Sequence, residues 1–142
     1  MFYGNTVQDT RGIFFQTWKK YQHKQALEPL ESQLLTVILQ HPEYLAILDQ
    51  QDYEKQYSPA LGITNPFLHM GLHLTIRDQI ALDRPVGIKA IFQQLCHHHN
   101  DDHQVEHLLF EPLIECLWQA QKNSVMPDEQ TYLLNCQILL NT

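Results

Sequence analysis

The sequence predicts an all-α protein of about six helices with a helical bundle at its centre. Apolar residues recur at three- to four-residue spacing in several segments. A proline or a capping residue stands at the start of most of these segments. No segment shows the sustained alternation of a β-strand or the turn signal of a hairpin. Because 142 residues are typical of one domain, we expect residues 1–142 to form a single helical domain.

Residues that start or stop a helix set the expected boundaries. We expect helices over about residues 9–27, 29–41, 42–48, 66–82, 86–96, 102–122 and 127–139. Pro29 suits the first turn of a helix, where its missing N–H is not needed. His41 ends that helix, because a residue before proline avoids the α region. Residues 1–8 are predicted to be a loose leader, and the polar residues 50–64 a loop.

The later helices have clearer starting signals. Asn65 and Pro66 supply an N-cap and a first-turn proline for the helix over 66–82. Residues 83–85, Asp-Arg-Pro, separate that helix from the next. The polar residues 100–102 cap the helix that follows, and Pro127 opens the last one.

Composition and charge exclude several classes of function. Nine Lys and Arg stand against sixteen Asp and Glu, a formal charge of −7 that would repel nucleic acid. The longest apolar runs are far shorter than the ~20 residues of a membrane helix. The first five residues lack the basic head and apolar stretch of a signal peptide. We therefore expect a soluble cytoplasmic protein without a nucleic-acid or membrane partner, whose partner is another protein or a second copy of itself.

The cysteines and the common catalytic motifs indicate no chemistry. Cys96, Cys116 and Cys136 form no Cys-x-x-Cys pair, which argues against a disulfide framework and a zinc ribbon. Each lies in a helical pattern and is predicted to be a small buried apolar residue. The chain has no glycine-rich phosphate loop and no nucleophile elbow.

Histidine is the unusual component, with nine residues. Two pairs have His-x-x-x-His spacing: His69 with His73, and His103 with His107. Residues four apart share one face of a helix, so each pair can offer two imidazoles to one ion. At 100° per residue, both pairs fall at the centre of an apolar stripe that we expect to face the core. We also expect the two helices to face each other. The only basis for this expectation is that both apolar stripes face the core.

Carboxylates accompany the second histidine pair, because Glu106 adjoins His107 and Glu111 follows one turn later. The candidate metal ligands are His69, His73, His103, His107, Glu106 and Glu111. Imidazole and carboxylate together suit a transition metal ion such as iron or zinc. The predicted function is transition-metal binding by a small helical protein, and no catalytic residue is assigned.

Alternative interpretations remain open at this point. The histidines can form a buried polar network without metal, in a non-enzymatic helical protein whose function is to bind a partner. They can also be partly exposed. A hydrolase that uses one histidine as a general base is a third function, and it requires a cleft. Whether the protein is an enzyme is therefore undecided by the sequence.

Several stretches of this sequence, taken together, are similar to the sequences of a known protein family. The longest are Asn65–His73, His41–Tyr44, Asp83–Pro85 with Gly87-Ile88, His103 with Glu106-His107 and Glu111, Leu117-Trp118, and Pro127-Asp128 with Tyr132-Leu133. With these stretches, the chain resembles the bacterial proteins grouped as domain of unknown function 1841 over nearly its whole length. It departs at Asp78 and Pro112, where the family leads us to expect Glu and Cys. The resemblance implies a small bacterial cytosolic protein and supplies no reaction.

Overall fold

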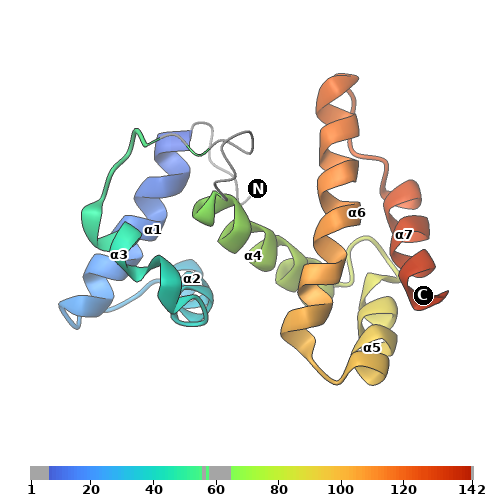
Figure 1. Ribbon diagram of the computed structural model, residues 1–142, viewed down its shortest axis with the longest axis horizontal. Helices are drawn as coiled ribbons and strands as arrows, with labels where there is room; N and C mark the ends of the chain where they lie inside the picture. The colour runs from blue at the N-terminus through green and yellow to red at the C-terminus, as the bar shows by residue number, and fades with distance from the viewer. Residues whose placement is uncertain (1–6, 56, 58–64, 142) are drawn as a thin grey trace. The chain divides into compact units, whose positions relative to one another are not determined.

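The computed structural model describes residues 7–55, 57 and 65–141. Within these ranges the chain forms seven α-helices, short 3-10 turns and no strand (Figure 1). The predicted all-α class of packed helices is confirmed. The predicted leader lies mostly outside the described residues, as does most of the predicted loop over 50–64. No helix in the described part of the chain has the length and apolar content needed to cross a membrane.

The helices belong to two compact units, Met1–Leu74 and Thr75–Thr142. The first contains α1 (Val7–Gln22), α2 (Pro29–Leu39), the 3-10 turn η1 (Pro42–Tyr44), α3 (Leu45–Gln50) and the first half of α4 (Pro66–Leu82). The second contains the rest of α4, α5 (Ile88–His99), α6 (Asp102–Lys122), α7 (Glu129–Ile138) and the 3-10 turn η3 (Leu139–Asn141). A single domain over residues 1–142 stays a prediction.

Local capping explains why most helix starts match the expected ones. Asn65 Oδ1 accepts the backbone N–H groups of Phe67 and Leu68 at 3.0 and 3.2 Å, which fixes the start of α4. Asp101 and Asp128 cap α6 and α7 in the same way. The first helix was expected to reach about Leu27 and this is wrong. It ends at Gln22, because Lys24 has a φ of 55°, a left-handed conformation that stops a helix.

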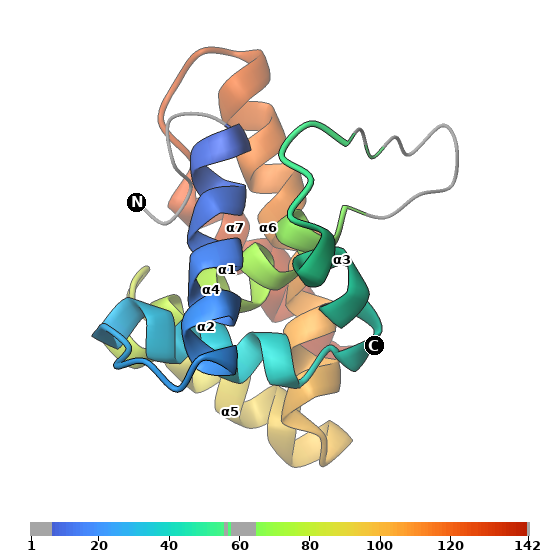
Figure 2. The same ribbon diagram turned by 90° about the vertical axis from the view of Figure 1, so that its left-hand side faces the viewer.

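The first unit has an aromatic core. α1 packs against α2 and α3, as Figure 2 shows. The buried core consists of Phe14, Phe15, Trp18, Leu34, Val37, Ile38, Leu48, Phe67, Met70 and Leu74. The Phe67 ring lies 5.7 Å from Phe14 and 5.5 Å from Phe15 between centroids. Because Phe67 is in the first turn of α4, these contacts fix the position of the next two turns, which carry His69 and His73.

In the second unit α6 packs against α5 and α7 (Figure 1). The buried side of α6 holds Val105, Glu106, Leu109, Pro112, Leu113 and Ala120. The predicted core stripe of this helix is therefore wrong, because His107, Ile114 and Trp118 are exposed. The true stripe lies roughly 130° further round the helix. α6 carries apolar residues on two faces, and periodicity alone does not decide which face is buried.

Candidate metal site

Three histidine rings gather in the first unit. His69 and His73 lie on successive turns of α4, and His41 stands between α2 and η1. The ring centroids are 5.0 Å apart for His41 and His69, 4.9 Å for His41 and His73, and 5.0 Å for His69 and His73. One nitrogen of each ring lies within 4.8 Å of the others. His41 and His73 are 2% and 0% exposed, and His69 is half-buried. We call this group the three-histidine cluster.

The spacing of two ring nitrogens in this cluster suits a shared ion. The Nε2 atoms of His69 and His73 are 3.3 Å apart. Two ligands held about 2.0–2.1 Å from a tetrahedral zinc ion would be roughly 3.3–3.4 Å apart. The same distance also suits a hydrogen bond from one protonated Nε2 to the other nitrogen. With a bound ion both nitrogens would direct their lone pairs at the metal, whereas without one the single lone pair would accept the hydrogen bond.

The third ring has a fixed tautomer. His41 Nδ1 lies 2.8 Å from the Val37 carbonyl oxygen. Because a carbonyl only accepts, Nδ1 carries the hydrogen, and in the neutral ring Nε2 then carries the lone pair. Metal-binding histidines usually have this arrangement, in which a backbone carbonyl orients the ring. The Tyr44 ring stacks on His41 with 4° between the planes and 5.4 Å between the centroids, which further holds the imidazole in place.

The second pair lies on α6, in the second unit. The rings of His103 and His107 are 4.5 Å apart between centroids, His103 half-buried and His107 exposed. A ring nitrogen of His103 lies within 4.8 Å of a Glu106 carboxylate oxygen. Both oxygens of this buried carboxylate accept from Arg77 Nε at 3.1 Å. Glu111 is exposed, and no potential metal-ligand group found among the described residues includes it.

The cysteine thiols and the Tyr44 hydroxyl are neutral at ordinary pH. Burial raises the pKa of Cys96 and of Cys136 to about 12, and nearby acidic groups add to the effect at Cys96. Burial also raises the pKa of Tyr44, helped by the charge of Glu43. Cys136 is buried as predicted, whereas Cys96 and Cys116 are only half-buried. The cysteines thus fit small apolar residues better than ready-made thiolate ligands.

The comparison with protein families gives one clear result. Residues 6–138 match the model described as "Domain of unknown function (DUF1841)". The chain belongs to this family. The resemblance drawn from the sequence is thereby confirmed, and the DUF1841 description names no activity. The searches of curated proteins and of solved structures gave no match.

In this DUF1841 chain the structure brings together two of the residues that the sequence predicts as ligands. His69 and His73 point into a buried group of histidines that can hold a metal ion, together with His41. The sequence did not single out His41 as a candidate, because its place before Pro42 marks only the end of a helix and it has no histidine four residues away. The one available signal was chemical, a histidine directly after the apolar stripe of a predicted core helix. His97, His98 and His99 lie exposed in the last turn of α5.

Proposed function

We propose that this protein binds a transition metal ion, zinc or iron, through His41, His69 and His73. The observation that carries the proposal is the hydrogen bond from His41 Nδ1 to the Val37 carbonyl. This bond places the hydrogen of the neutral ring on Nδ1, so the lone pair is on Nε2, the atom that would bind the ion. The 3.3 Å between the Nε2 atoms of His69 and His73 supports it. Imidazole nitrogens are good ligands for both ions.

Three imidazoles leave one position of a tetrahedral shell for a water, a substrate or another side chain. A water in that position would become a better nucleophile on a divalent ion. The sequence prediction adds His103, His107, Glu106 and Glu111 as further ligands, and this part rests on their spacing alone. Glu106 is held by Arg77 and lies close enough to orient His103. The proposal assigns no reaction.

A second function has a specific observation in its favour. The 3.3 Å between the two Nε2 atoms also fits a metal-free hydrogen bond. The cluster would then be a structural polar network in a helical protein whose function is to bind a protein partner or a second copy of itself. In that case removing a histidine would cost stability and no metal would be lost.

The deciding measurement is the metal content of untagged protein purified without chelators. We expect about one ion per chain in the wild type and loss of that ion in His73→Ala and His41→Asn. The His41→Asn variant is the sharper one, because its amide nitrogen can still donate to the Val37 carbonyl while the Nε2 ligand is gone. His97→Ala, which changes an exposed histidine of α5, is the matched control and should keep the ion.

The metal proposal is wrong if wild-type protein contains no metal and is not stabilised by added zinc or ferrous ion. The double variant His103→Ala/His107→Ala tests the remaining ligands separately. If that variant keeps the ion, the sequence-predicted second pair is not part of the site. If it loses the ion while staying folded, the predicted second pair supplies ligands.

A further inference from the structure

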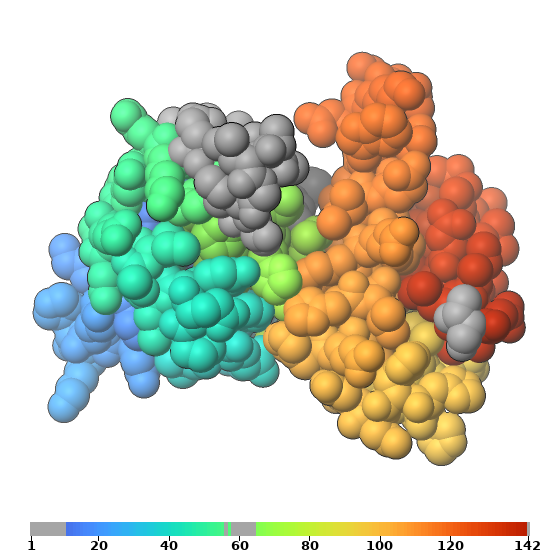
Figure 3. Space-filling view, viewed as in Figure 1, coloured from blue at the N-terminus to red at the C-terminus, as the bar shows by residue number. Residues whose placement is uncertain are grey.

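A second site lies on the half of α6 that carries neither His103 nor His107. A pocket of about 400 Å³ opens between the C-terminal turns of α6, the turn over 123–128 and the start of α7. This end of α6 projects from the second unit (orange in Figure 3). The volume is within the range of small-molecule sites. All the residues that line the pocket belong to the second unit.

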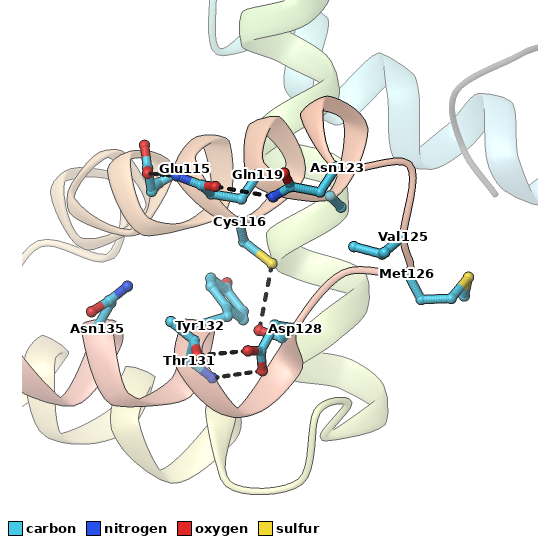
Figure 4. A pocket seen from close by; sticks show the side chains of 11 residues that line it. Glu115, Cys116, Gln119, Asn123, Val125, Met126, Asp128, Thr131, Tyr132 and Asn135 are labelled. Carbon is cyan, nitrogen blue, oxygen red and sulfur yellow. Dashed lines mark hydrogen bonds between the residues drawn. The ribbon is translucent and has the colours of Figure 1, made fainter.

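The pocket has a neutral floor. Cys116 and Tyr132 lie in its middle, as Figure 4 shows. Burial raises the pKa of both the Cys116 thiol and the Tyr132 hydroxyl, so both stay uncharged. The Tyr132 hydroxyl donates to Gln79 at 2.6 Å, outside the pocket lining. A ligand on this floor would therefore contact the Cys116 thiol and the Tyr132 ring. Together they form a surface suited to an aliphatic chain.

The rim carries negative charge at both ends. Glu115 stands on the α6 wall and Asp128 on the α7 wall, with Cys116 and Tyr132 between them (Figure 4). Hydrogen bonds from Thr131 lower the pKa of Asp128 and keep it ionised. Among the described residues that line the pocket there is no lysine, arginine or histidine.

Amide groups complete the α6 wall and orient its carboxylate. Asn123 Nδ2 donates to Gln119 Oε1 at 3.4 Å, and Gln119 Nε2 donates to Glu115 Oε1 at 2.9 Å. This chain of hydrogen bonds runs along the α6 wall and ends at the Glu115 carboxylate, which is its acceptor. Beside the opening, Val125 and Met126 are 62% and 84% exposed and extend the apolar surface.

We propose that this pocket binds an aliphatic diamine or polyamine. One ammonium group sits at the Glu115 carboxylate, the methylene chain crosses Cys116 and Tyr132, and the second ammonium group lies at Asp128. Two carboxylates separated by an apolar floor match two cations separated by methylene groups. Charge-assisted hydrogen bonds to carboxylates are the strong contacts of such a complex. A monoamine or a neutral diol of the same length satisfies only part of the pocket.

Calorimetric titration with 1,5-diaminopentane at physiological salt tests this, because salt screens general attraction to an acidic protein. We expect Glu115→Gln to weaken binding about tenfold, the effect of losing one charge-assisted contact. Asp128→Asn keeps the helix cap and should have a smaller effect, because its oxygens already accept from Thr131. Glu129→Gln is the control, since Glu129 is an exposed neighbour that does not line the pocket.

Pentylamine should bind more weakly than the diamine, and 1,5-pentanediol should not bind measurably. The proposal is overturned if the diamine does not bind, or if Glu115→Gln and Glu129→Gln weaken it equally, which would indicate general electrostatic attraction. Equal binding of the neutral diol would also overturn it. Thermal unfolding of each variant confirms that it is folded. The result is independent of metal binding, because no residue of the three-histidine cluster is changed.

Discussion

At the scale of single residues, the buried carboxylate of Glu106 depends on Arg77. The Glu106 side chain is 8% exposed and that of Arg77 is 27% exposed. Removing the guanidinium leaves a carboxylate that is largely cut off from water. We expect Arg77→Met to lower the free energy of unfolding by about 2 kcal/mol, less than the roughly 3–5 kcal/mol of a fully buried pair, because Arg77 is partly solvated. Urea unfolding at neutral pH measures this.

The matching control removes the charge that Arg77 compensates. In the double variant Arg77→Met/Glu106→Gln the buried side chain is neutral, so we expect it to be less destabilised than the sum of the two single variants. Strictly additive losses would contradict the idea that the pair acts as a unit. The same variants also test whether Glu106 orients the His103 ring, because the two side chains lie close together on α6.

At the scale of secondary structure, α4 depends on its N-cap. Asn65 Oδ1 satisfies two backbone N–H groups of the first turn. We expect Asn65→Ala to lower the free energy of unfolding by about 1 kcal/mol, the usual loss for an N-cap. Asn65→Asp keeps the acceptor and adds a favourable charge at the helix N-terminus, so it should be at least as stable as the wild type. Chemical denaturation of both variants compares them, and equal losses would rule out the capping role.

The start of α2 gives a pH-dependent prediction. The pKa of Glu31 is held below its ordinary 4.5 by the backbone N–H of Glu28 at 2.8 Å and by Lys20 at 2.9 Å. A lowered folded-state pKa contributes stability above pH 4.5 that is lost as the pH falls through the folded value. Glu31→Gln should therefore be less stable than the wild type near pH 6, and the difference should shrink below pH 4.5.

Thermal unfolding of both proteins across pH 3–7 measures that difference, in steps of about half a pH unit. Glu43→Gln, which changes an exposed glutamate in η1, is the control and should not reproduce the pattern. A gap between wild type and Glu31→Gln that stays constant down to pH 3 would contradict the role given to the Glu31 charge.

The elements also show what the sequence determines by itself. α4 was predicted residue for residue, because Asn65-Pro66 and the 83–85 break are local signals. In the same segment His69 and His73 were predicted to face the core, and His73 is buried and His69 half-buried. α6 has apolar residues on two faces, and the packing of α5 and α7 selected the Val105–Leu109–Leu113 face. His41 belongs to the three-histidine cluster through tertiary packing, which periodicity does not encode.

At the scale of the whole molecule, metal binding should stabilise one unit of the chain and leave the other unchanged. His41, His69 and His73 all belong to the first unit, Met1–Leu74. An ion that binds only the folded state stabilises it by about 2.7 kcal/mol at roughly 100 times its Kd. Hydrogen exchange with and without added zinc locates this stabilisation along the chain. The absence of nucleic-acid and membrane partners stays a prediction from charge and composition.

We expect zinc to slow amide exchange in α2 and in the first half of α4, which carry the cluster and the Val37 carbonyl. Amides of α5 and α7 should exchange at the same rate with and without the ion. The His41→Asn variant is the control, because it lacks a ligand and should show no zinc-dependent slowing. Slowing that is confined to α6 around His103 and His107 would contradict the three-histidine assignment and favour the second pair. Slowing in both regions would show that the ion takes ligands from α6 as well, as the spacing of its histidines first indicated.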